Sequence, residues 1–194
     1  GTALARGDLI NQNAADPKAS GPDGNGGLVN VPGDFRELQG TLWAHDHRFF
    51  FTAENVYKGN PSMVNLYSGR DRGNEQHNDG ANLRLPSGKF LDYGNVDFDV
   101  NLIISDGATD QDGQYFFDVF TTDGFLGDIP LVNFAYAPYM EVLPRKYRFR
   151  ILPGAMSRFW QLVFAAPNAT PIAVKQVAND GNFLVNPVVV TTLD

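Results

Sequence analysis

Cysteine is absent from the 194 residues of the chain, and only three histidines occur, His45, His47 and His77. The absence of cysteine excludes disulfides, thiolate metal sites, iron–sulfur clusters and cysteine nucleophiles within this sequence. Any histidine chemistry of the chain must therefore use those three side chains. The cellular compartment stays open, because a cysteine-free chain suits any redox environment.

Long apolar runs and an excess of basic residues are also missing. No stretch approaches the roughly 18 consecutive apolar residues of a membrane-spanning helix, so we expect no membrane span. Residues 1–20 lack the apolar block of a signal peptide. Fifteen Lys and Arg against 22 Asp and Glu give a formal charge of −7. This acidic balance argues against a nucleic-acid-binding protein.

The residues that are present favour a packed all-β protein. Hydrophobic residues make up 43% and charged residues 19% of the chain, which is enough for a core. Short runs of β-formers recur between Gly, Pro, Asn and Asp turns, and no window of about 12 residues has a helical period. Such a pattern is typical of a β-sandwich or barrel. The clearest runs are 40–51, 62–67, 96–104, 114–120, 131–134, 136–142, 147–151, 159–164, 172–177 and 188–192.

The most informative local pattern is His45-Asp46-His47. On a strand, residues two apart point to the same face, so the two imidazoles can bind one metal ion together or each ligate one of two adjacent metal ions. Neutral imidazole suits copper, zinc, iron and nickel. The alternative is a pair of surface or hydrogen-bonded histidines. Trp43 and the phenylalanines of 49–51 can form an apolar wall around a metal or belong to an ordinary core, and Asp46 is expected to have a structural role.

Three other sequence features could suggest a functional site, but each favours a structural explanation. His77 lies in a polar loop, where a solvated histidine is more common than a ligand. The acidic stretch 106–112 lacks the spacing of an EF-hand calcium loop, so we expect a hairpin turn. Asn168-Ala169-Thr170 fits the glycosylation sequon, but Pro171 follows it.

Several segments together resemble one known family. Residues 42–47 read L-W-A-H-D-H and residues 51–59 read F-T-A-E-N-V-Y-K-G. This pair resembles the second copper-binding motif of the multicopper oxidases, in the branch of bacterial laccases, spore-coat oxidases and bilirubin-oxidase-like enzymes. The segments 123–133, 141–152, 157–160 and 178–181 resemble further family segments in the same order, so the resemblance covers about residues 40–194.

The resemblance implies a cupredoxin-like Greek-key β-sandwich fold. Residues 1–69 would be the C-terminal part of a first cupredoxin-like domain, residues 70–95 an interdomain linker, and residues 96–194 an incomplete second domain. The chain would then be a central fragment of the oxidase. Tyr147, Phe149, Ile151 and Trp160 would belong to the core of the second domain rather than to a site.

The resemblance also implies a role for the His pair. His45 and His47 would each ligate one of the two type 3 coppers of a trinuclear cluster that reduces O2 to water. Phenols, aromatic amines, pigments or metal ions would supply the electrons. The ligands of type 1 copper and the other cluster ligands would come from the remainder of the same oxidase, and an extracellular, periplasmic or spore or cell-surface location would follow.

Two other classes of function remain open. The first is a non-redox β-sandwich that serves as a binding or structural module, with a His pair that is bare or incidentally metallated. The second is a zinc hydrolase, which needs a third protein ligand and an open zinc position for an activated water.

Overall fold

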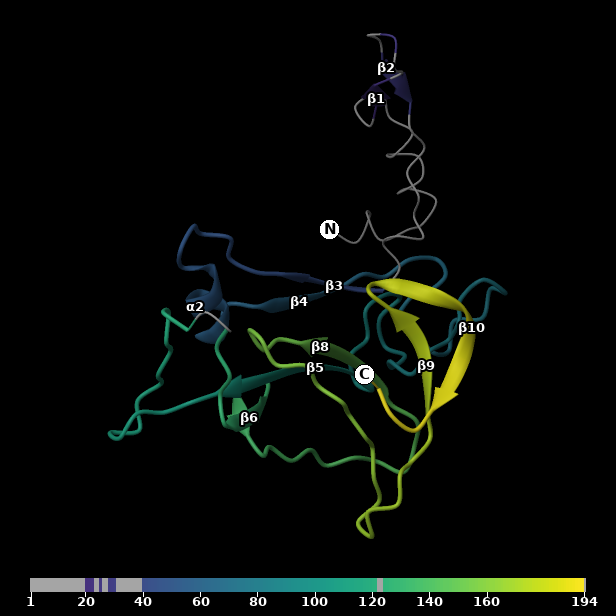
Figure 1. Cartoon of the computed structure of the whole chain (residues 1–194). Helices are drawn as coiled ribbons and strands as arrows, with labels where there is room; N and C mark the ends of the chain where they lie inside the picture. Colours follow the sequence, from purple (N-terminus) through teal and green to yellow (C-terminus); the bar gives the residue numbers. More distant parts are fainter. Residues whose placement is uncertain (1–19, 23–24, 26–27, 31–39, 122–123, 194) are drawn as a thin grey trace.

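The computed structural model describes residues 20–22, 25, 28–30, 40–121 and 124–193 of the chain. Strands dominate these residues, and the single described helix is six residues long (Figure 1). The elements in chain order are β1 Ser20–Pro22, β2 Leu28–Asn30, β3 Thr41–Ala44, α2 Thr52–Tyr57, β4 Ser62–Asn65, β5 Asp99–Gly107, β6 Ile129–Val132, β7 Ala135–Tyr136, β8 Arg148–Pro153, β9 Val174–Asn179 and β10 Asn182–Val190. The predicted all-β class is confirmed. The described part contains no helix long and apolar enough to cross a membrane.

The strand expected over residues 40–51 is shorter than predicted. β3 pairs antiparallel with β4 from Thr41 opposite Asn65 to Ala44 opposite Ser62, and the pairing ends there. Continuation would place His45 opposite Pro61, which has no backbone N–H for the ladder. His45 and His47 therefore lie in the loop after the strand, and the prediction of a strand through them is wrong.

Helix α2 follows this loop and closes it. The backbone N–H groups of Phe51 and Thr52 donate to the Arg48 carbonyl at 3.0 and 2.9 Å, and the Thr52 hydroxyl donates to the same oxygen at 2.8 Å. Val56 and Tyr57 at the end of the helix are buried. A helix this short depends on such tertiary contacts, because isolated helices of about 12 residues are already marginal in water.

A four-stranded sheet in the order β7-β6-β5-β8 forms the centre of the described part. β5 pairs antiparallel with β6 and parallel with β8, with Asp99 opposite Arg148 and Ile104 opposite Pro153. Ile104 on β5 and Leu131 on β6 are among the few buried apolar side chains of the described residues. The sheet therefore brings 99–107 and 148–153 together from distant parts of the sequence.

On β8 the arginines, rather than the apolar residues, are the most buried. Arg148 and Arg150 are 8% and 4% exposed, whereas Tyr147 and Phe149 are only half-buried. Ile151 and Trp160, which were also predicted to be core, are half-buried too. The two-residue alternation is real, but the arginine face is the enclosed one because acidic partners lie against it.

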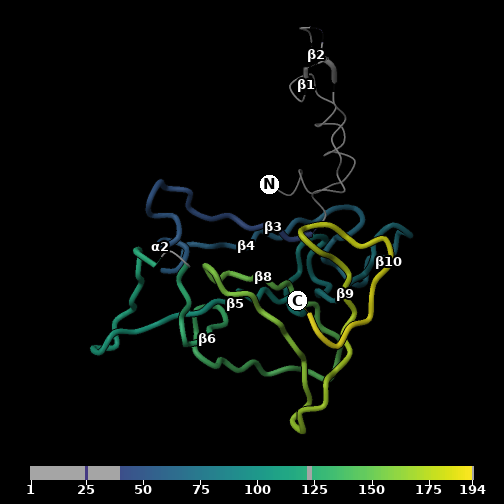
Figure 2. Tube along the Cα trace, in the orientation of Figure 1, coloured from purple at the N-terminus to yellow at the C-terminus, as the bar shows by residue number. Residues whose placement is uncertain are grey.

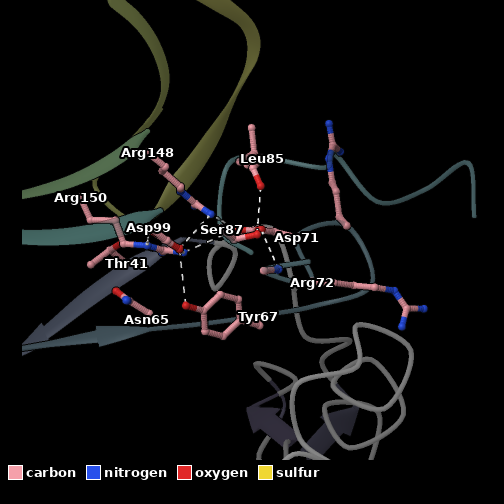
Figure 3. A network of polar contacts seen from close by, with 12 residues as sticks. Thr41, Asn65, Tyr67, Asp71, Arg72, Leu85, Ser87, Asp99, Arg148 and Arg150 are labelled. Atoms are coloured by element: carbon pink, nitrogen blue, oxygen red, sulfur yellow. Dashed lines mark hydrogen bonds and ion pairs between the residues drawn. The ribbon is translucent and has the colours of Figure 1, made fainter. Parts of the chain in front are cut away.

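These partners form a buried network of two cations and two anions (Figure 3). Arg148 Nη1 lies 2.6 Å from Asp71 Oδ2, and Arg150 Nη2 lies 2.7 Å from Asp99 Oδ2. Arg150 Nη1 also donates to the Thr41 hydroxyl at 2.8 Å. The network therefore joins β3, the connection after β4, β5 and β8, and its charges balance as buried charges must.

The course of the connection between β4 and β5 (residues 66–98) can be followed in Figure 2. Residues 70–95 contain no strand or helix, as their turn-rich composition predicts, whereas the strand expected from residue 96 begins only at Asp99. The connection is nevertheless closely hydrogen-bonded. Asn95 Nδ2 donates to the carbonyls of Gly73 and Leu91, both at 2.7 Å, and Ser87 in the same connection is fully buried. The division into residues 1–69, 70–95 and 96–194 stays a prediction, and residues 1–19, 23–24, 26–27 and 31–39 lie outside the described residues.

The C-terminal hairpin contacts the start of β3. β9 and β10 pair antiparallel around the turn at 180–181, with a register shift between Phe183 and Val188. A Cβ atom at Gly40 would lie 2.8 Å from the Gly181 carbonyl oxygen, so only glycine permits this close approach. The hairpin is thereby fixed beside the strand that leads to His45.

Three predicted strands do not form within the described residues. Residues 136–142 contribute only Tyr136 to the two-residue strand β7. Residues 114–120 have only the isolated bridge between Thr109 and Tyr115, and residues 159–164 only the bridge between Leu162 and Leu193. Their apolar alternation is present, but no described strand lies alongside to pair with them.

Candidate metal centre

His45 and His47 lie side by side in the loop after β3. Their ring centroids are 5.8 Å apart and the ring planes are inclined by 35°. The indole of Trp43 stacks on the ring of His45, with a centroid distance of 4.4 Å and an angle of 19°. Both histidines are exposed. The two imidazoles are thus adjacent, as the sequence predicts, although a loop and not a strand presents them.

A backbone hydrogen bond sets the tautomer of His45. Its Nδ1 lies 2.7 Å from the carbonyl oxygen of Asp46. A carbonyl oxygen only accepts hydrogen bonds, so in the neutral ring Nδ1 carries the proton. Nε2 then presents its lone pair to the surroundings, which is the state in which a histidine binds a metal.

The carboxylate of Asp46 is occupied by the loop itself. Asp46 Oδ2 accepts from Asn55 Nδ2 at 2.7 Å and from the Arg48 backbone N–H at 3.2 Å. The hydrogen bond from Asn55 is the main reason that the pKa of Asp46 lies below its usual value. Asp46 therefore has a structural role between the two histidines.

The phenylalanines after the His pair are not an ordinary core. Phe49 and Phe50 are 83% and 84% exposed, and Phe51 is about half exposed. The Arg48 guanidinium lies 5.0 Å from the centre of the Phe51 ring. Phe50 has a φ of +66°, a left-handed conformation that non-glycine residues seldom adopt. The apolar side chains next to the His pair therefore face outward.

The donor set of this site fits copper but is incomplete. Two neutral imidazoles are good ligands for copper, and one of them has its lone pair exposed. In the parts of the chain that the structure describes, no group of three His, Cys, Asp or Glu side chains could hold a metal. A metal at His45 and His47 would thus need further ligands from elsewhere.

The third histidine lies away from the pair and has its own partner. His77 Nε2 is 3.2 Å from Asp79 Oδ2, and the same oxygen is 3.1 Å from Arg72 Nη2. Backbone N–H groups of Asn82 and Ala81 are the main cause of the strongly lowered pKa of Asp79. His77 is therefore part of a loop ion cluster.

The acidic stretch 106–112 ends in a hairpin turn, as predicted. Asp110 Oδ1 accepts the backbone N–H groups of Asp112 and Gln114, both at 2.9 Å. Asp106 is buried and pairs with Arg158 instead, at 3.1 Å. Asn168 of the sequon lies in an exposed turn, where its Oδ1 accepts from the Thr170 N–H.

Sequence reasoning missed two residues that hold the loop. Asn55 reaches back to Asp46, and Tyr57 anchors α2 by exchanging hydrogen bonds with the Ala108 backbone at 2.9 and 3.1 Å. The N-V-Y letters at 55–57 carry this signal, but the resemblance to a copper-binding motif gives no role to Asn55 or Tyr57.

Comparison with known proteins identifies the family. No protein-family model matches the chain. The bilirubin oxidase of Albifimbria verrucaria is 36% identical over 172 residues, which is 82% of this chain and 27% of that protein. A laccase of Bacillus stratosphericus is 33% identical over 162 residues, or 76% of this chain and 28% of the laccase.

A solved structure shows the same fold. The McoA multicopper oxidase of Aquifex aeolicus superposes with a TM-score of 0.64 at 24% identity, over 87% of this chain and 33% of McoA. The predicted cupredoxin-like fold is thereby confirmed. The chain spans about a quarter to a third of the length of these relatives. By sequence and by fold, the chain belongs to the multicopper oxidase family.

Proposed function

We propose that His45 and His47 each bind one of the two type 3 coppers of a trinuclear cluster, in an oxidase that reduces O2 to water. The observation that carries this proposal is the adjacency of the two imidazoles, whose ring centroids are 5.8 Å apart. Bound copper would supply the electron transfer from a reducing substrate to O2.

The residues of this chain would hold and orient the metal. The hydrogen bond from His45 Nδ1 to the Asp46 carbonyl leaves Nε2 as the ligand atom, and Trp43 fixes the ring by stacking. The other copper ligands, including those of type 1 copper, would come from the remainder of the same oxidase. Two observations support this part of the proposal: the described residues hold no group of three potential ligands, and the sequence contains no cysteine.

The substrate class and the location are carried over from the resemblance. The relatives named bilirubin oxidase and laccase support a small reducing substrate such as a phenol, an aromatic amine, a pigment or a metal ion. We place the protein outside the cytoplasm, in an extracellular, periplasmic or spore or cell-surface location. Cell fractionation tests this, and recovery only in the cytosol would contradict it.

One comparison favours the non-redox alternative. The cell division protein FtsP of Sodalis glossinidius is 34% identical over 158 residues, which is 81% of this chain and 29% of FtsP. A related sequence is thus named for a process other than oxidation. In that case the chain would be a structural or binding module.

Metal analysis and oxygen consumption separate the candidates. The complete protein containing this chain is loaded with copper, desalted and analysed, and O2 uptake is followed with a phenolic substrate. The proposal predicts bound copper, the near-ultraviolet absorption of a coupled copper pair, and O2 uptake. Protein that binds no copper and consumes no O2 would favour the non-redox module, and bound zinc with hydrolysis would favour the zinc enzyme.

A further inference from the structure

We propose that Asn55 is a positioning residue for His45, and that it acts through Asp46. Its amide Nδ2 donates to Asp46 Oδ2 at 2.7 Å, while the carbonyl oxygen of the same Asp46 accepts from His45 Nδ1 at 2.7 Å. The part of this proposal that concerns copper rests on the proposed function.

Asp46 couples the two hydrogen bonds because it bears both acceptors. Its carboxylate is held at two points, by Asn55 and by the Arg48 N–H, so the side chain and backbone of Asp46 have one orientation relative to α2. The carbonyl that receives the His45 Nδ1–H is fixed with them. Since the partner of one ring nitrogen decides which nitrogen is free, this carbonyl selects Nε2 as the ligand atom.

The helix that carries Asn55 is itself fixed to the central sheet. The Tyr57 hydroxyl accepts the Ala108 N–H at 2.9 Å and donates to the Ala108 carbonyl at 3.1 Å, just beyond the end of β5. The Tyr57 ring packs edge-on against Phe125 at a centroid distance of 4.7 Å. Tyr57 thus fixes α2 to the residue after β5, and Asn55 on the same helix holds Asp46, whose carbonyl accepts from His45.

The anchoring of α2 matters for the orientation of the two rings because the loop that carries His45 and His47 is exposed to solvent. His45 and His47 are both exposed, and Phe49 and Phe50 next to them are exposed as well. Burial thus contributes little to the orientation of the rings. The Asn55–Asp46 hydrogen bond links the residue between the two histidines to the helix that Tyr57 anchors. The side chain of Glu54, on the same helix, pairs instead with Lys58 just past the helix end.

The test measures the tautomer of His45 in the metal-free protein and its affinity for copper. The complete protein is labelled with 15N-histidine, and long-range proton–nitrogen NMR spectra report which ring nitrogen carries the proton, with His45→Gln for assignment. Cu(I) affinity is measured by competition with a chelator. Glu54→Gln is the matched control on the same helix.

We expect an Nδ1–H tautomer at His45 in the wild type and in Glu54→Gln. Asn55→Ala should give a mixture of tautomers and an affinity for Cu(I) about 10- to 100-fold lower. Asn55→Asp has nearly the same shape but sets a carboxylate against the Asp46 carboxylate, so it should shift the tautomer and the affinity in the same direction. Asp46→Asn keeps an oxygen that can accept both the Asn55 amide and the Arg48 N–H, so it should retain the wild-type tautomer and affinity.

Two results would overturn the positioning role. One is Asn55→Ala with an unchanged tautomer. The other, decisive if Asn55→Ala does not fold, is a folded Asn55→Asp variant with an unchanged tautomer. Failure of this proposal and failure of the proposed function can be told apart. Wild-type protein that takes up no copper at the His pair would contradict the proposed function, and the NMR measurement on metal-free protein would still decide the role of Asn55.

Discussion

Arg150 donates two hydrogen bonds to the Asp99 carboxylate across the parallel pair of β5 and β8, from Nε at 2.8 Å and from Nη2 at 2.7 Å. The remaining guanidinium nitrogen, Nη1, donates a hydrogen bond to the hydroxyl of Thr41 on β3, the strand that leads to His45. Burial alone would lower the pKa of Arg150, but the Asp99 carboxylate more than offsets this and the pKa is raised. One buried cation thus ties the strand before the His pair to the central sheet.

Removal of this cation should strongly destabilise the protein. Arg150→Met leaves the Asp99 carboxylate buried, with Arg148 as its remaining cationic partner at 3.6 Å. We expect a loss of about 3–5 kcal/mol in the free energy of unfolding, measured by chemical denaturation. Arg70→Gln is the control, because Arg70 is exposed, and it should change stability by less than about 0.5 kcal/mol. Equal losses in the two variants would contradict the importance of the network.

The ion pair between Glu75 and Arg145 should make stability depend on pH. Arg145 Nη2 lies 2.6 Å from Glu75 Oε2. Partial burial is the largest single influence and raises the pKa of Glu75. The hydrogen bonds from Arg145 and the Ser87 N–H, together with the charge of Arg145, more than offset it, so the pKa lies below the ordinary value of 4.5. A carboxyl whose pKa is lower in the folded state stabilises the protein above its unfolded pKa, and this contribution is lost as the pH falls through the folded value.

Arg145→Gln should therefore be less stable than the wild type at pH 7, by about 0.5–1 kcal/mol for a pair that is partly exposed. The difference should shrink as the pH falls below about 4, where Glu75 becomes protonated. Thermal unfolding over a pH series measures it. Lys146→Gln removes the neighbouring exposed cation and should show no such pH dependence; a difference for Arg145→Gln that is constant with pH would count against the ion pair.

The hydroxyl of Tyr57 is predicted to stabilise the anchor of α2. Tyr57→Phe leaves the Ala108 N–H without its partner in a partly buried position, which should cost about 1–3 kcal/mol. Tyr115→Phe is the matched control, because Tyr115 is 58% exposed and touches Tyr57 only through the edge of its ring. Denaturant unfolding compares the two variants, and an effect of Tyr115→Phe as large as that of Tyr57→Phe would refute the prediction.

The sequence predicts the class of the fold because the two-residue alternation is a local property. At 147–151 the alternation correctly indicates a strand with one enclosed face. It does not show which face is enclosed, because Asp71 and Asp99, which make burial of Arg148 and Arg150 favourable, come from distant parts of the chain. At 115–117 the alternation places Tyr115 and Phe117 against Tyr57, but strand pairing also requires a neighbouring strand.

The candidate site could be predicted in part. The spacing of His45 and His47 correctly indicates two adjacent rings, although the assumed strand ends at Ala44. Two local features end it: Pro61 cannot continue the ladder, and the Asp46 carboxylate accepts the Arg48 N–H in a turn that competes with strand pairing. The contact between Asn55 and Asp46 depends on how α2 folds back, which spacing alone does not reveal.

The most direct test of the account compares the three histidines of the chain. His45→Ala and His47→Ala in the complete, copper-loaded protein should each lose bound copper, the near-ultraviolet absorption of the coupled pair and O2 uptake. His77→Ala should keep all three, because His77 belongs to the Asp79 ion cluster. Retention of copper, absorption and O2 uptake in both His45→Ala and His47→Ala would contradict the assignment of the metal centre.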